Sequence, residues 1–266
     1  MIRLHLKDLA TCLSCPMPAV DATVDNIATD SRKVHHGSLF AALPGNNVDG
    51  HDFASKAVDL GAAALLLNRP LDLDVPQLVV EDVLLALGKI ANLLRTRLDP
   101  VMVGITGSNG KTTVKEMIAS ILRQQSAVLA TQGNYNNELG VPLSLFDLKA
   151  EHQYAVLEMG ASKSGDIAYL CEIAQPDVGL ITNIGPAHLR GFGTVEGVAK
   201  AKGEIYSCLP AEGCAVINGD EAWLDLWREV NQANRVLTFG GSSGCDIRLV
   251  EDGTSAVLAI PGGEIE

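Results

Sequence analysis

The stretch Val101-Met-Val-Gly-Ile-Thr-Gly-Ser-Asn-Gly-Lys-Thr-Thr113 joins an apolar, partly β-branched strand to a helix through a glycine-rich turn. Glycines in such a turn let backbone N–H groups point inward, and the amino end of the helix adds partial positive charge. This context is typical of a phosphate-binding loop, or P-loop. The common form Gly-x4-Gly-Lys-[Ser/Thr] is not met, because Ile105 occupies the position of its first glycine; the shorter Gly107-x2-Gly110-Lys-Thr-Thr stands here. A glycine-rich turn that binds no ligand is the alternative.

The residue types of this loop predict a site for ATP and Mg²⁺. Lys111 would reach the β and γ phosphates of ATP. Thr112 would offer its hydroxyl to Mg²⁺, a hard cation that prefers oxygen ligands. The predicted ATP-binding residues are Gly107, Ser108, Asn109, Gly110, Lys111, Thr112 and Thr113.

Strands and helices alternate on the carboxyl side of the loop, which predicts an α/β fold with a mostly parallel sheet covered by helices on both faces. The expected strands are 101–106, 154–158, 178–183, 214–218 and 235–239, and the expected helices are 111–124, 165–174, 194–207 and 221–231. After Cys245, two apolar runs flank residues 251–254, which is typical of a β-hairpin. Ligands of parallel sheets bind at the carboxyl ends of the strands, where the loop lies.

Asp99-Pro100 ends a helical pattern, so the sequence predicts a domain boundary near residue 98. Residues 1–98 mix short apolar strands with helical patterns at 51–60 and 82–95, and are predicted to form a small α/β domain. Residues 99–266 are predicted to form a second domain, which carries the predicted ATP site.

Composition narrows the class of protein. The net charge is −12 with no dense Lys/Arg cluster, which argues against a nucleic-acid partner. No apolar run approaches the ~20 residues of a membrane helix, and no export signal is visible, so we expect no membrane insertion. Six scattered cysteines suit a reducing cytoplasm, and Cys12 and Cys15 lack the second pair that a zinc site needs. The oligomeric state is not indicated.

Other residues are candidates for chemistry beside the loop. Glu158 ends an apolar strand, where a carboxylate can hold a metal ion, although a solvated strand end is the alternative. His188 follows the next strand, whereas Lys200 and Lys202 read as ordinary helix lysines by sequence alone. Two polar clusters could contact a substrate, or be plain turns: the amides Asn134, Asn136 and Asn137, and Ser31 with Arg32, whose guanidinium suits a phosphate.

Five segments, in this order along the chain, resemble the Mur ligase family of bacterial peptidoglycan synthesis. They are residues 106–113, 133–142, 157–161 with 165–167, 183–189, and 191–193 continuing into 199–206. The resemblance implies that Lys111 binds ATP phosphates, that Thr112 and Glu158 hold a first Mg²⁺, and that His188 holds a second. It implies that Lys202 is carbamylated and contacts metal, so Lys111, His188 and Lys202 are the expected catalytic residues. Asn134, Asn136 and Asn137 would face the muramoyl or pyrophosphate part of the substrate, and Ser31, Arg32 and the loop 40–45 its uridine diphosphate end.

The implied reaction is ATP-dependent ligation of a carboxylate to an amine through an acyl phosphate. Within the family, the residues Glu-Met-Gly-Ala at 158–161 and Gly-Pro-Ala-His at 185–188 favour the step that joins D-alanyl-D-alanine to UDP-N-acetylmuramoyl-tripeptide. Three alternatives stay open: a catalytically silent module that binds UDP-muramoyl peptides or nucleotides, the Mur ligase that adds the third peptide residue, and the related folylpolyglutamate synthetases. Residues 30–32 and 37–40 argue against the last group, which begins directly with its ATP-binding domain.

The resemblance implies that residues 1–98 form the substrate-binding domain and residues 99–266 a central ATP-binding domain that is incomplete at its carboxyl end. Members of the family continue beyond the point that corresponds to Glu266, with more of the central domain and a third domain. We therefore expect that the 266-residue chain by itself is not a competent ligase, although it carries most of the phosphate-binding and metal-binding groups.

Overall fold

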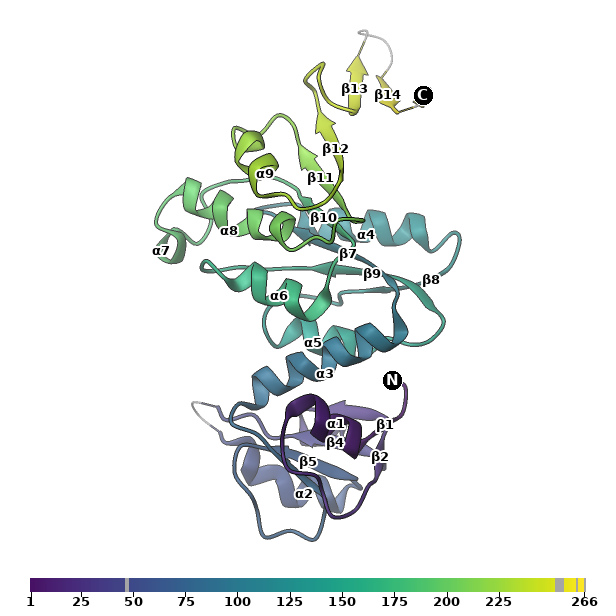
Figure 1. The fold of residues 1–266 in the computed structure, drawn as a ribbon, viewed down its shortest axis with the longest axis vertical. Helices are drawn as coiled ribbons and strands as arrows, with labels where there is room; N and C mark the ends of the chain where they lie inside the picture. The colour runs from purple at the N-terminus through teal and green to yellow at the C-terminus, as the bar shows by residue number, and fades with distance from the viewer. Residues whose placement is uncertain (46–47, 252–255, 262, 266) are drawn as a thin grey trace. The chain divides into compact units, whose positions relative to one another are not determined.

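The computed structural model describes residues 1–45, 48–251, 256–261 and 263–265. The chain divides into two compact units, Met1–Asp99 with Pro142–Glu151, and Pro100–Val141 with His152–Glu266. Each unit combines helices with a mostly parallel sheet, so the expected α/β class is confirmed (Figure 1). The return of residues 142–151 to the first unit is a feature that the sequence does not indicate.

The first unit is built on a parallel four-stranded sheet in the order β3-β4-β5-β6. Its strands and helices are β1 Leu4–His5, α1 Leu6–Leu13, β2 Thr23–Val24, β3 Asn26–Ala28, β4 Ser38–Ala41, α2 Ala54–Asp59, β5 Ala64–Leu67, β6 Gln77–Val79 and α3 Val83–Leu98, with 3-10 helices η1 Ser31–Lys33 and η2 Gly50–Phe53. Every residue of β5 is buried, as expected for a parallel strand covered on both faces. Helix α3 begins where the Asp82 side chain accepts a hydrogen bond from Leu85 N, and it ends at Asp99, in the left-handed region, before Pro100.

The second unit contains a nine-stranded sheet in the order β15-β14-β13-β12-β11-β10-β7-β9-β8. The strands are β7 Val101–Thr106, β8 Ala127–Ala130, β9 His152–Glu158, β10 Val178–Ile181, β11 Cys214–Asn218, β12 Arg235–Gly240, β13 Ile247–Glu251, β14 Ala256–Ile260 and β15 Gly263–Ile265. The helices are α4 Lys111–Leu122, α6 Asp166–Ala174, α7 Leu189–Phe192, α8 Val195–Ser207 and α9 Leu224–Val230; α5 Gly140–Leu145 spans the point where the chain changes unit.

Alternate residues of β7 face different helices. Val103 and Ile105 pack with Ala119 of α4 in one apolar cluster. A Cβ built on Gly104 would lie 3.2 Å from Ile205 of α8, so this glycine lets α8 approach the opposite face of the sheet closely. The P-loop helix α4 and the helix that carries Lys202 therefore cover opposite faces of the strand from which the loop leaves (Figure 1).

The strands and helices expected for the second unit are present with shifted ends; the helix expected at 221–231, for example, is limited to Leu224–Val230. Strands β13 and β14 pair antiparallel, in agreement with the expected hairpin, whose turn at 252–255 lies outside the described residues. Strand β8 and the short helices α1, α5 and α7 were not expected. Within the described ranges no helix is both long and apolar enough to cross a lipid bilayer.

Candidate active site

Three neighbouring parallel strands, β10, β7 and β9, end at one edge of the sheet, and each is followed by candidate residues. The loop after β7 needs glycine at two positions for different reasons. Gly110 has φ +78° at the N-cap of α4, a backbone conformation that other residues adopt at a cost. Gly107 has φ +144°, and a Cβ there would collide with the Thr182 hydroxyl. The loop is thus shaped both by its own backbone and by the segment after β10.

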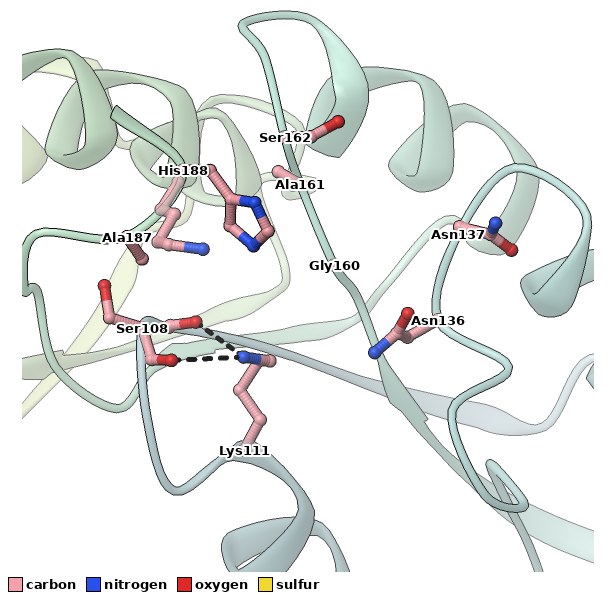
Figure 2. A pocket seen from close by; sticks show the side chains of 11 residues that line it. Ser108, Lys111, Asn136, Asn137, Gly160, Ala161, Ser162, Ala187 and His188 are labelled. Carbon is pink, nitrogen blue, oxygen red and sulfur yellow. Dashed lines mark hydrogen bonds between the residues drawn. The ribbon is translucent and has the colours of Figure 1, made fainter. Parts of the chain in front are cut away.

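A cavity of about 220 Å³ lies beside this loop. Figure 2 shows Lys111, Asn136 and His188 approaching it from different walls. Its lining residues are Gly107, Ser108, Lys111, Asn136, Asn137, Gly160, Ala161, Ser162, Ala187, His188 and Lys202. All of them belong to the second unit, so the cavity is complete within one compact body.

The Lys111 ammonium lies over the loop that precedes it. Its Nζ donates to Gly107 O at 2.9 Å and is 3.5 Å from Ser108 O (Figure 2). The N–H groups of the first turn of α4 have no acceptor within the helix. A lysine ammonium beside N–H groups that lack an acceptor in their own helix is an arrangement that binds phosphate.

Glu158 is a buried carboxylate, 4% exposed, held by two side chains. Thr112 Oγ1 donates to Glu158 Oε2 at 2.7 Å, and Asn136 Nδ2 donates to Glu158 Oε1 at 2.9 Å. The Thr112 hydroxyl and the carboxylate thus provide adjacent oxygen ligands, which fits Mg²⁺, an ion that binds few protein ligands and keeps several waters. Asn136 was expected to face substrate; the structure places it in the cavity wall with its amide nitrogen on Glu158.

Burial distinguishes the two lysines of α8. Lys200 is exposed and pairs with Glu196 at 2.7 Å. Lys202 is 3% exposed and lines the cavity, and its ammonium has no hydrogen-bond or ion-pair partner in the described part of the chain. Burial, and secondarily the charge of Lys111, lowers the pKa of Lys202 from 10.5 to about 8. The cavity therefore holds two basic side chains, which favours an anionic ligand.

His188 lies in the cavity wall and has φ +49°, a left-handed conformation that is uncommon for a residue with a Cβ. It is exposed and stands at the N-cap of α7, where its carbonyl accepts a hydrogen bond from Gly191 N at 2.9 Å. The ring carries a nitrogen that can serve as a metal ligand.

The remaining predicted residues of the second unit lie around the cavity with different exposure. Asn137 lines it, and its Oδ1 accepts from Gly140 N at 2.8 Å. Asn134 is exposed and is not among the lining residues. Asn109, Gly110, Thr112 and Thr113 also lie outside the lining set, although they belong to the loop or to the first turn of α4.

Ser31 and Arg32 line a separate cavity of about 520 Å³ in the first unit. Ser31 is buried, whereas the Arg32 side chain is 82% exposed. Arg32 Nη2 lies 2.7 Å from Asp30 Oδ2, and hydrogen bonds from Arg32 lower the pKa of Asp30 to about 2. The guanidinium expected to meet a phosphate is thus already paired with a carboxylate that lines the same cavity.

Two residues that were not predicted as site residues, Thr182 and Asn183, make several hydrogen bonds to the P-loop. Thr182 Oγ1 donates to Asn109 O at 2.7 Å. Asn183 contacts the same residue through both the oxygen and the nitrogen of its side-chain amide. Their place directly after β10, the neighbour of β7, is the signal that could have identified them.

Comparisons with known proteins agree with this geometry. A sequence profile described as Mur ligase middle domain matches residues 105–266, and one described as Mur ligase family, catalytic domain, matches residues 23–95. The chain therefore belongs to the Mur ligase family. Within it, the chain is similar to UDP-N-acetylmuramoyl-tripeptide–D-alanyl-D-alanine ligase of Escherichia coli strain K12: the two are 43% identical over 273 residues, which cover 100% of this chain and 60% of that relative.

Solved structures give the same result. MurF from Acinetobacter baumannii superposes with a TM-score of 0.91 at 36% identity, over 100% of this chain and 60% of that chain. MurF ligase from Thermotoga maritima in complex with ADP has a TM-score of 0.78 at 38% identity, over 88% of this chain and 55% of that chain. The chain thus spans about 60% of the length of the first relatives it matches.

Proposed function

We propose that this chain carries the ATP and substrate sites of a ligase that joins D-alanyl-D-alanine to UDP-N-acetylmuramoyl-tripeptide. The observation that carries the proposal is the cavity beside the P-loop, where Lys111, His188 and Lys202 converge next to the Thr112–Glu158 pair. The similarity to ligases that bear this name favours the dipeptide-adding step over addition of the third residue. Because the reaction consumes ATP, the proposal places the chain in the cytoplasm.

In this proposal the two units have different tasks. The second unit binds ATP with residues 107–113, and Thr112 and Glu158 would hold Mg²⁺, with His188 and the carbamate of Lys202 available to a second ion. Bound Mg²⁺ supplies charge neutralisation for the phosphate oxygens. The first unit, through its residues 1–98, holds the uridine diphosphate end in the cavity lined by Ser31 and Arg32. Asn137 and Asn134 contact the muramoyl or pyrophosphate part.

The proposed chemistry transfers the γ-phosphoryl group of ATP to the terminal carboxylate of the tripeptide, giving ADP and an acyl phosphate. The free amine of D-alanyl-D-alanine then attacks the acyl carbon, phosphate leaves, and the nitrogen loses a proton. Lys111 moves from the loop carbonyls to the transferring phosphate, which needs positioning and charge rather than covalent help from side chains.

Carbamylation of Lys202 is part of the proposal. Carbon dioxide reacts with a neutral amine, and the lowered pKa of Lys202, about 8, makes the neutral form accessible near physiological pH. A carbamate would convert a buried cation without a partner into an anion beside the metal-binding groups. Intact-mass analysis in bicarbonate, with Lys202→Met as the control, tests this step.

The test of the function combines binding with turnover. Mg²⁺–ADP and UDP-N-acetylmuramoyl-tripeptide are titrated into the chain by calorimetry, and ADP release is then followed with ATP, the tripeptide substrate and D-alanyl-D-alanine present. Lys111→Met should weaken nucleotide binding by about tenfold or more, the size of one lost charge-assisted contact.

Three results separate the hypotheses. Binding of both ligands with ADP release that depends on the dipeptide supports a ligase active in this chain. Binding of both ligands without release supports a chain that holds the sites but does not complete the reaction, as a silent binding module would. Failure of the chain to bind Mg²⁺–ADP contradicts the proposal.

A further inference from the structure

We infer that Asn183 is a positioning residue that fixes the P-loop in its phosphate-binding shape. The inference rests on the proposed function only insofar as the loop binds the phosphates of a nucleotide. It concerns a residue that acts through the backbone of Asn109 rather than by touching the ligand.

The Asn183 side chain pairs with both backbone groups of one loop residue. Asn109 N donates to Asn183 Oδ1 at 3.0 Å, and Asn183 Nδ2 donates to Asn109 O at 3.0 Å. The backbone of Asn183 adds a third bond, since its carbonyl accepts from Ser108 N at 2.9 Å. A single residue after β10 therefore bonds to three consecutive peptide groups of the loop, 107–108, 108–109 and 109–110. Thr182 Oγ1 is a second donor to Asn109 O, at 2.7 Å.

The hydrogen bonds between Asn183 and the loop, which we call the Asn183 clamp, also determine which N–H groups remain for a ligand. The N–H groups of Ser108 and Asn109 are used by Asn183. Those of the first turn of α4 have no acceptor within the helix. Asn183 thus holds Ser108 and Asn109 and leaves the N–H groups at the start of α4 to bind phosphate oxygens.

A loop with glycines at Gly107 and Gly110 needs such a constraint. Glycine has more conformational freedom than other residues, so an unconstrained loop loses more entropy when it closes on a ligand. A loop already fixed in the binding geometry avoids that cost, which appears as higher affinity.

The segment that carries Asn183 is itself anchored. Asn218 Nδ2 donates to Thr182 O at 3.2 Å, and Ile184 N donates to Glu221 Oε1 at 2.8 Å. Ser108 Oγ donates to Gly185 O at 3.2 Å and accepts from Gly185 N at 2.9 Å. The clamp therefore ties the loop to a segment held by residues at and after the end of β11.

The chain offers a matched control in Asn231. Its amide makes the same two bonds to the backbone of one residue: Nδ2 donates to Ala233 O at 2.8 Å, and Oδ1 accepts from Ala233 N at 3.1 Å. Asn231 follows α9 and does not line the cavity. Asn183→Ala and Asn231→Ala thus remove equivalent side-chain bonds, and only the first removes them from the P-loop.

The experiment measures the Kd of Mg²⁺–ADP by calorimetry and the melting temperature of the parent chain, Asn183→Ala, Asn231→Ala and Asn183→Asp. Asn183→Ala should weaken ADP binding by about tenfold, whereas Asn231→Ala should stay within about twofold of the parent, with similar losses of melting temperature. Asn183→Asp keeps an acceptor for Asn109 N, loses the donor and adds a negative charge beside the phosphates, so it should bind ADP more weakly than Asn183→Ala.

Failure of the inference is distinguishable from failure of the function. A parent chain that does not bind ADP overturns both. A parent chain that binds ADP, with Asn183→Ala equal in affinity to Asn231→Ala, overturns the positioning role alone. If Asn183→Ala does not fold, the isosteric Asn183→Asp decides, and an ADP affinity within about twofold of the parent overturns the inference.

Discussion

Cys208 is the most reactive thiol that the structure indicates. A hydrogen bond from the buried Cys171 thiol lowers the pKa of Cys208 from 9.0 to about 7, and the same bond raises the pKa of Cys171. Alkylation requires the thiolate, so the rate of Cys208 modification by iodoacetamide should rise with a midpoint near pH 7. The pKa of Cys208 is lower in the folded than in the unfolded chain, so its thiolate stabilises the fold. This stabilisation is complete above about pH 9 and is lost as the pH falls through about 7.

Peptide mass spectrometry after timed alkylation resolves Cys208 from the other cysteines. Cys171→Ala removes the hydrogen-bond donor and should move the midpoint upward, because partial burial then dominates. Cys171→Ser retains a donor and should keep the midpoint near that of the parent. Equal midpoints for the alanine and serine variants would contradict the role given to Cys171.

Gly107 should tolerate a side chain less well than Gly110. Both have positive φ, which costs a residue with a Cβ about 1–2 kcal/mol, but only at Gly107 would the new Cβ also collide with Thr182. Gly107→Ala should therefore lower the free energy of unfolding more than Gly110→Ala. Urea denaturation followed by tryptophan fluorescence measures this in the second unit, because both tryptophans, Trp223 and Trp227, lie there.

A double variant isolates the steric part of that effect. Thr182→Ala removes the hydroxyl that the Cβ would meet, so it should recover part of the loss caused by Gly107→Ala. Additive losses in the double variant would mean that backbone strain alone accounts for the cost.

The site residues differ in how far their sequence context reveals them. Lys111 and His188 each follow a predicted strand and Glu158 ends one, so topology alone brings them to one edge of the sheet, and in the structure Lys111 and His188 line the same cavity. Lys202 lies on a helix where burial, not sequence, separates it from Lys200. Asn183 is missed because an amide that pairs with a distant backbone leaves no local pattern. The chemical roles of these residues stay predictions.

At the scale of elements, one carboxylate of α8, that of Glu204, links this helix to the start of α6. Glu204 of α8 accepts hydrogen bonds from Ser164 Oγ, Gly165 N and Ala168 N at 3.0, 2.8 and 3.0 Å. It thus caps the first turn of α6 from another helix, close to Ser162 in the cavity wall. Glu204→Ala should lower the free energy of unfolding of the second unit by about 1.5–3 kcal/mol.

Glu196, on the same helix, is the control. It is exposed, and among the residues that the structure describes it pairs only with Lys200, so Glu196→Ala should cost about 0.5 kcal/mol or less. Glu204→Gln, which keeps a carbonyl acceptor, should fall between the two. Urea denaturation measures all three, and a Glu204→Ala value no larger than that of Glu196→Ala would show that the cap contributes little.

The elements that were predicted best are those whose pattern is set by burial. The strand 101–106 was placed correctly because a parallel strand buried on both faces is a continuous apolar run. The strand 214–218 was also placed correctly, although only alternate residues of it are fully buried. Helix α1 was missed because its eight residues follow a start that alternates polar and apolar side chains. Strand β8 was missed because Ala127–Ala130 is short and lies at the edge of the sheet, where packing rather than propensity decides.

For the whole molecule, the notable feature is that the first unit is discontinuous in sequence. Pro142–Glu151 belongs to it although the chain on both sides belongs to the second unit. Leu145, Phe146 and Leu148 within this segment are buried, with exposed fractions of 0%, 6% and 0%. The prediction of one continuous boundary near residue 98 did not include this return, because no turn or composition signal marks a segment that is recruited by burial alone.

Because the chain divides into two compact units, a cavity made in the core of one unit should destabilise mainly that unit. Leu145→Ala removes a fully buried side chain of the first unit, and Leu170→Ala removes one of α6 in the second, each at a cost of about 2–5 kcal/mol. In hydrogen exchange, Leu145→Ala should lower the protection of amides in β4 and β5 and leave β7 and β10 nearly unchanged, whereas Leu170→Ala should do the opposite. If Leu145→Ala instead lowers protection in β7 as much as in β4, residues 142–151 stabilise the second unit as well, and the two units unfold as one cooperative body.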